Sequence, residues 1–155
     1  MSDDRAPRAV GALLAAGQAI GPYRVTAVTR SSASETVYAA EGGTSGDAPR
    51  AYEIRERAAG AYDYARPVTS LGISHAHLLA PVAVLTQSGR DYLVIEALDE
   101  DAHSAGARLS AEGALQAGAA LADVLTYLHG GGVAHLRIAP AHIVVHGGAA
   151  YLTGL

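Results

Sequence analysis

The strongest constraint on the fold of this 155-residue chain is a pair of apolar runs, LLAPVAVLT at 78–86 and DYLVIEAL at 91–98. Only the four residues QSGR, at 87–90, lie between them. Gly89 can adopt the backbone angles that a tight turn requires, because it has no Cβ atom. Two strand-like runs joined by so short a polar turn predict a β-hairpin.

Three further segments have the β-branched and aromatic residues typical of strands. They are PYRVTAVTR at 22–30, SETVYAAE at 34–41 and RAYEIRER at 50–57, and they are separated by turn-like polar sequence. A weak helical pattern follows the third strand, but Pro67 lacks the amide hydrogen that a continuous helix needs. We therefore expect five strands, with one short or displaced helix between the third and the fourth.

The second half of the chain predicts one long helix followed by a small hairpin. Ser110 is a plausible N-cap, and the helix should run to about His129, where the GGG at 130–132 ends it. The segments 142–146 and 149–155 then form two short strands around a Gly-Gly turn. The apolar stripe predicted for the helix consists of Leu115, Gly118, Ala122 and Leu125, and Leu121 and Leu128 flank it.

Composition excludes several classes of function. Eleven basic residues against fifteen acidic ones give a formal charge of -4, so the chain has no basic footprint for nucleic acid or an anionic membrane. Cysteine is absent, which excludes disulfides and thiolate chemistry. No apolar run approaches the length of a membrane span, and we expect a cytoplasmic protein.

Two stretches resemble a known family closely. HAHLLAPVAVLTQSGRDYLVIEAL at 75–98 and ALADVLTYLHGGGVAHLRIAPAHIVVHGGAAYLTGL at 120–155 are similar to bacterial serine/threonine protein kinase domains, and the similarity covers roughly residues 22–155. The resemblance implies an α+β fold. A small lobe with a five-stranded antiparallel sheet and one helix would be followed by a partial large lobe with a long helix, a catalytic-like loop and a β-hairpin.

This resemblance also implies a division of the chain. Residues 1–20 would be a leader, 21–98 the kinase-like small lobe and 99–155 the partial large lobe. The sequence ends at the magnesium-binding motif of the family, so the kinase-like domain is expected to be truncated there.

The positions that the resemblance assigns to catalysis are degenerate. The aspartate that accepts the substrate proton becomes Arg137, and the metal-binding asparagine becomes His142. The aspartate of the Asp-Phe-Gly motif becomes Gly154, and no acidic residue follows Asp123. Kinases position phosphates with magnesium held by such groups, so the resemblance implies that no catalytic residue is left.

The phosphate-binding positions upstream are altered as well. The glycine-rich loop of the family corresponds to Arg30, Ser32 and Glu35, and the last of these brings a negative charge to the loop. The strand lysine falls on Arg55. Its helix glutamate falls near Arg66, so two cations would repel each other unless Asp63 substitutes.

These positions indicate a catalytically inactive pseudokinase that acts as a regulatory or scaffolding protein-interaction module, without phosphotransferase activity. The alternative is an ATP-dependent serine/threonine protein kinase, or a fragment of one, that uses non-standard residues. No cofactor is expected, although Arg55 and the hinge residues Glu96 and Leu98 leave room for ATP binding without magnesium.

A protein partner or a second copy of the chain is expected to bind through Leu115, Ala122 and Leu125, because the helices that cover this surface in the family are missing from this sequence. No metal site is expected. The histidine pairs, His75 with His77 and His142 with His146, have no acid or thiolate nearby in the sequence to complete a ligand set.

Overall fold

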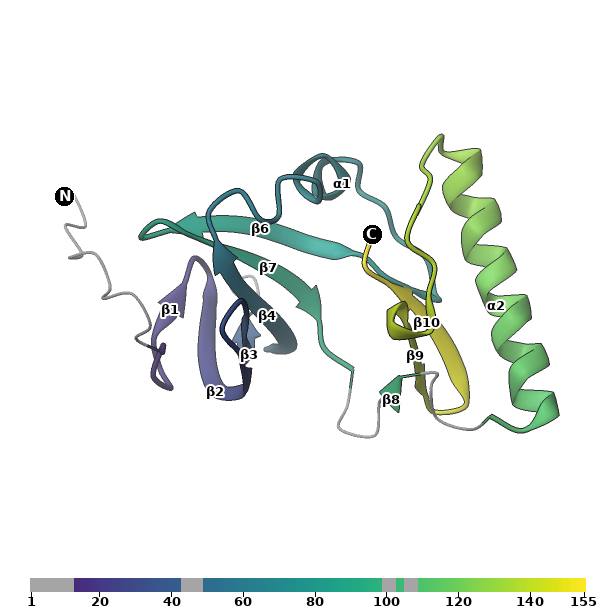
Figure 1. Ribbon diagram of the computed structural model, residues 1–155, viewed down its shortest axis with the longest axis horizontal. Helices are drawn as coiled ribbons and strands as arrows, with labels where there is room; N and C mark the ends of the chain where they lie inside the picture. Colours follow the sequence, from purple (N-terminus) through teal and green to yellow (C-terminus); the bar gives the residue numbers. More distant parts are fainter. Residues whose placement is uncertain (1–12, 43–48, 99–102, 105–108) are drawn as a thin grey trace. The chain divides into compact units, whose positions relative to one another are not determined.

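The computed structural model describes residues 13–42, 49–98, 103–104 and 109–155 (Figure 1). The chain divides into two compact units. Unit 1 consists of the chain up to Pro67 together with Val82–Ala97, and unit 2 consists of Val68–Pro81 together with Leu98–Leu155.

Unit 1 is built on a six-stranded sheet. Its order is β1 (Ala19–Ile20), β2 (Tyr23–Ser31), β3 (Thr36–Gly42), β4 (Arg50–Ala58), β7 (Arg90–Glu96) and β6 (Pro81–Gln87). The pairs from β1 to β4 and the pair β4–β7 are antiparallel. The five expected strands are confirmed, and the short β1 extends the sheet at its β2 edge. The β6–β7 turn places Ser88 and Gly89 at positive φ, as a two-residue hairpin requires.

The core of unit 1 lies on one face of this sheet. Tyr38, Ile54 and Val94 are completely buried, and each comes from a different central strand. Leu14 and Ile20 pack into the same cluster. Of the expected leader, residues 1–12 lie outside the described part of the chain, whereas Leu14 and Ile20 belong to the core.

The helix expected between the third strand and the hairpin is short. It is α1 (Arg66–Ser70), five residues long, and it contains Pro67 near its start, where the missing amide hydrogen does no harm. None of its residues is buried.

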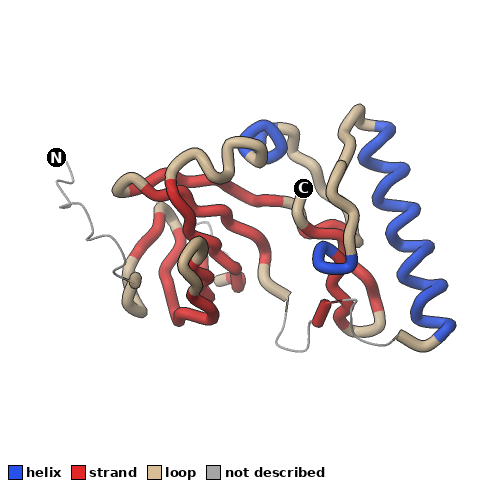
Figure 2. The backbone as a smooth tube through the Cα atoms, viewed as in Figure 1, coloured by secondary structure: helices blue, strands red, loops and turns tan. Residues whose placement is uncertain are grey.

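Unit 2 combines one long helix with a small sheet. Its elements are β5 (Leu78–Leu79), β8 (His103–Ser104), α2 (Ala111–Gly130), the 3₁₀ helix η1 (Pro140–His142), β9 (Ile143–His146) and β10 (Ala149–Thr153), and the sheet order is β5-β10-β9-β8 (Figure 2). The Ser110 side chain accepts a hydrogen bond from the Gly113 amide at 3.0 Å, which confirms the predicted N-cap. The β9–β10 hairpin confirms the expected pair of strands.

The predicted stripe on α2 is only partly buried, along Leu125 and the flanking Leu121 and Leu128. The buried residues of the helix are Ala117, Val124 and Leu128, and Leu121 and Leu125 pack beside them. By contrast Leu115 is 76% exposed, and Gly118 and Ala122 are exposed too. The buried face carries bulky side chains in successive turns, whereas glycine and alanine offer little apolar area to remove from water.

Candidate functional site

The loop between α2 and η1 is anchored by His135. This side chain is buried, and its Nδ1 accepts a hydrogen bond from the Arg137 amide at 3.3 Å. The proton therefore lies on Nε2, which donates to the Thr153 carbonyl oxygen at 2.7 Å. Burial lowers the pKa of His135 below its usual value of 6.5. The hydrogen bond to Thr153 raises this pKa, and the charges of His142 and Arg137 lower it further. A neutral His135 thus ties the loop to β10.

The structure brings together the three degenerate positions of unit 2. His142 donates from Nδ1 to the carbonyl oxygen of Arg137, and its ring lies against Gly154. A Cβ atom at Gly154 would lie 3.0 Å from His142 Cδ2, and the residue has φ of +83°. An aspartate at this position would therefore be strained by its backbone and crowded by the imidazole.

These three positions supply no carboxylate to a metal ion. Arg137 is a permanent cation, His142 has one ring nitrogen in use, and Gly154 has no side chain. Within the described ranges, no group of three or more His, Asp or Glu side chains is placed to hold a metal. Magnesium prefers carboxylate oxygens, so this loop does not offer the ligands that phosphoryl transfer uses.

Two apolar residues of the loop are exposed to solvent. Ile143 packs against the core of unit 2 and Leu152 is fully buried within it, but Ile138 is 52% exposed. Leu136, which follows the buried His135, has a positive φ of 58° and is 89% exposed. The hydrogen bond from His135 to β10, and not the side chains of Leu136 and Ile138, attaches this part of the loop to the sheet.

The turn between β2 and β3 stands at the phosphate position that the resemblance assigns. Its polar groups bond to each other. The Ser32 amide donates to the Glu35 carbonyl oxygen at 2.8 Å, and the Glu35 amide donates to Ser32 Oγ at 3.1 Å. Two backbone amides of this turn are thus already satisfied by the turn itself.

The Glu35 side chain lies in a cluster of donors from three other segments. Tyr62 donates its hydroxyl to Glu35 Oε1 at 3.1 Å, Arg57 Nε lies 3.1 Å from the same oxygen, and Arg30 Nη2 lies 3.3 Å from Oε2. The register of β3 and β4 pairs Thr36 with Glu56, which brings the neighbouring Glu35 toward Arg57. Burial and the Glu35 charge raise the pKa of Tyr62, so its hydroxyl stays protonated.

Arg55 and Arg66 each have their own carboxylate. Arg55 Nε donates to Glu53 Oε1 at 2.6 Å, and both side chains are about one third exposed. Arg66 pairs with Asp63 at 3.0 Å and with Asp91 at 3.0 Å. The sequence predicted repulsion between Arg55 and Arg66 unless Asp63 substituted for the missing glutamate. Asp63 does pair with Arg66, while Arg55 pairs with Glu53 in a separate group.

The other two expected nucleotide contacts, Glu96 and Leu98, belong to different units of the chain. Glu96 ends β7 and its carboxylate pairs with Arg50 at 3.6 Å, where both side chains are largely exposed. Leu98 is half-buried and belongs to unit 2. Within unit 1, Arg55 and Glu96 are therefore engaged with different partners.

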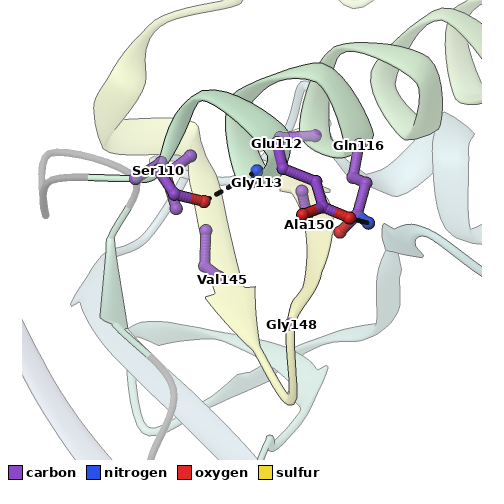
Figure 3. Close-up of a pocket in the computed structure, with 9 residues that line it drawn as sticks. Ser110, Glu112, Gly113, Gln116, Val145, Gly148 and Ala150 are labelled. Atoms are coloured by element: carbon purple, nitrogen blue, oxygen red, sulfur yellow. Dashed lines mark hydrogen bonds between the residues drawn. The ribbon is translucent and has the colours of Figure 1, made fainter.

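One cavity of unit 2 was not predicted from the sequence. It has a volume of about 350 Å³ and lies between the start of α2 and the β9–β10 hairpin (Figure 3). Its polar groups bond to each other, because Ser110 caps the helix and Glu112 accepts from Gln116 at 3.4 Å. Its lining consists of ordinary helix and hairpin residues, and no sequence motif marks it.

Comparison with known proteins gives the fold a counterpart. No protein-family model and no curated protein matches the sequence. Among solved structures, the kinase domain of PknI from Mycobacterium tuberculosis, a double mutant, superposes with a TM-score of 0.69 at 21% identity and covers 92% of this chain. Rad53 residues 1–466, in complex with AMP-PNP, superposes with a TM-score of 0.65 at 14% identity and covers 85%.

These similarities establish a protein kinase-like fold, with a sheet-based small lobe followed by part of a large lobe. This confirms the expected α+β architecture. The chain spans 63% of the PknI structure and 38% of the Rad53 structure. In addition, the described helices include none with the length and apolar character needed to cross a membrane.

Proposed function

We propose that this kinase-like chain is a catalytically inactive pseudokinase, a cytoplasmic module that regulates or scaffolds other proteins through contact. The observation that carries the proposal is the cluster of Arg137, His142 and Gly154. The three positions at which the resemblance expects a general base and two metal ligands lie next to each other, and none offers a carboxylate. The Ser32–Glu35 turn adds support, because its amides and its acid are engaged internally.

We expect ATP with magnesium to leave the Tm of the purified chain unchanged. A ligand present at a hundred times its Kd would stabilise the folded state by about 2.7 kcal/mol, which a thermal shift assay detects readily. Labelled ATP should also transfer no phosphate to the chain or to a general protein substrate. A serine/threonine kinase of known activity, assayed in parallel, is the positive control.

The same assay separates the alternatives. A magnesium-independent shift that Arg55→Ala abolishes would indicate residual nucleotide binding by a pseudokinase, with the Arg55 guanidinium on the phosphates. Phosphate transfer that depends on magnesium would contradict the proposal and favour the active-kinase alternative. Arg24→Ala, which removes the same charge from an exposed position on strand β2, is a matched control for Arg55→Ala.

We propose that the exposed face of α2 is the surface that binds another protein. Leu115 and Ala122 lie exposed on this helix, whereas Leu125, the third residue expected there, is half-buried against the core of unit 2. Because Leu115 is 76% exposed, a partner that covers it removes more apolar area from water than one that covers the half-buried Leu125.

We expect the isolated chain to associate with itself through this face. Leu115→Glu places a charge in the contact and should shift the mass measured by light scattering to that of a monomer. Gln116→Glu, one residue along the helix, changes the net charge equally and should leave the mass unaltered. A wild-type chain that is monomeric at high concentration would contradict self-association.

A further inference from the structure

Two arginine side chains and a tyrosine hydroxyl surround the Glu35 carboxylate, as they would surround a bound anion. Its side chain is 16% exposed. Oε1 accepts a hydrogen bond from Tyr62 and lies 3.1 Å from Arg57 Nε in an ion pair, in which the geometry leaves Nε without a hydrogen bond. Oε2 accepts a hydrogen bond from Arg30 at 3.3 Å. These groups come from β2, from β4 and from the segment that follows β4. Three segments of unit 1 therefore meet at a single acid.

The donors have the chemistry that binds phosphate. Guanidinium groups form charge-assisted hydrogen bonds to phosphate oxygens, and a protonated tyrosine hydroxyl adds a neutral donor. The Arg57 guanidinium lies 5.9 Å from the centre of the Tyr62 ring, which helps to hold it in place. If the carboxylate were absent, two cations and one hydroxyl would face the same space.

The turn that carries Glu35 is held by hydrogen bonds of its own. The Ser32 amide and Ser32 Oγ both donate to the Glu35 carbonyl oxygen, Oγ at 3.0 Å. The backbone of Glu35 is therefore held independently of the contacts that its side chain makes. The nearby strand acid Glu53 pairs with Arg55 at 2.6 Å.

We propose that the Glu35 carboxylate occupies an oxyanion site formed by Arg30, Arg57 and Tyr62, and thereby excludes phosphate groups from this turn. The ligand class that this site would accept without Glu35 is inorganic phosphate or a phosphate monoester. This inference goes beyond the proposed function, since it requires neither ATP nor magnesium.

The test is a titration of Glu35→Ala with inorganic phosphate, followed by NMR of the arginine side-chain Nε–H groups and the backbone amides. We expect saturable shifts at Arg30, Arg57 and Tyr62, with an affinity at least about tenfold higher than that of the wild-type chain. Sodium chloride at matched ionic strength corrects for screening.

Glu41→Ala is the matched control, because it removes one exposed carboxylate from strand β3 of the same sheet and changes the net charge equally. It should bind phosphate no better than the wild type. The double variant Glu35→Ala with Arg57→Gln should lose the gain. Equal binding by the Glu35 and Glu41 variants, retention of binding in the double variant, or no gain at all would overturn the proposal.

A second variant covers the case in which Glu35→Ala does not fold, as judged by amide dispersion. Glu35→Gln keeps the side-chain volume and removes only the charge, so it is titrated in the same way. Saturable phosphate binding at Arg30 and Arg57 by this variant supports the proposal, and its absence from a folded variant overturns it. Neither result depends on the ATP assay above, so the two proposals fail separately.

Discussion

Replacing Asp91 with alanine is expected to lower the free energy of unfolding by about 3 kcal/mol, because it removes a buried carboxylate that accepts three hydrogen bonds. Asp91 is fully buried. Its oxygens accept from the Gly60 amide at 2.8 Å, from Thr86 Oγ1 at 2.7 Å and from Arg66 Nη2 at 3.0 Å. The network joins the start of α1 to the β6–β7 hairpin. Urea denaturation of both proteins at neutral pH measures the loss.

The control uses the second acid of the same arginine. Asp63 pairs with Arg66 at 3.0 Å, but its side chain is 68% exposed, and such surface pairs contribute about 0–1 kcal/mol. Asp63→Ala should therefore cost much less than Asp91→Ala. Equal losses would show that burial of the Asp91 network does not stabilise unit 1.

The stabilisation by Asp91 should also depend on pH. Burial alone raises the pKa of Asp91, but the hydrogen bonds from Thr86 and Gly60 and the Arg66 charge outweigh it and lower the pKa below the usual 3.8. A folded-state pKa below the unfolded value gives stability that is present above 3.8 and lost as the pH falls through the folded-state pKa. The difference in the free energy of unfolding between the wild type and Asp91→Ala should therefore become smaller below pH 3.8.

Local signals explain why the strands and α2 could be predicted. The QSGR turn requires positive φ at Ser88 and Gly89, and glycine next to a small polar residue is a signal contained in four residues. Ser110 and the three glycines after His129 likewise mark the two ends of α2 within one turn each. The two-residue strand β1 has no such signal, because it is defined by its pairing with β2.

The parts that could not be predicted depend on contacts between distant residues. Both carboxylates that are buried in the described part of the chain belong here: Glu56 pairs with Arg90, 34 residues away, and Asp91 with Arg66, 25 residues away. Before the register of the sheet is known, these acids look like ordinary alternating surface charges. In the candidate site, the absence of acids is a property of the sequence, but the approach of Glu35 to Tyr62 follows from the fold.

The sequence also did not predict which face of α2 is buried. The second large effect on the free energy of unfolding is expected from a residue of this buried face. Leu128→Ala should destabilise the chain by about 3 kcal/mol, because the side chain is fully buried and its loss leaves a cavity. It packs with Val124 and Leu152 in the core of unit 2. Thermal and urea denaturation followed by circular dichroism measure the change.

Leu136→Ala removes the same atoms from a side chain that is 89% exposed, so its cost should stay within about 0.5 kcal/mol. The left-handed backbone at Leu136 is unaffected in the comparison, since alanine has the same Cβ atom. If the Leu128 and Leu136 variants lose equal stability, α2 does not bury the face that carries Val124 and Leu128. Its orientation would then have to be the one in which Leu115, Gly118 and Ala122 face the core.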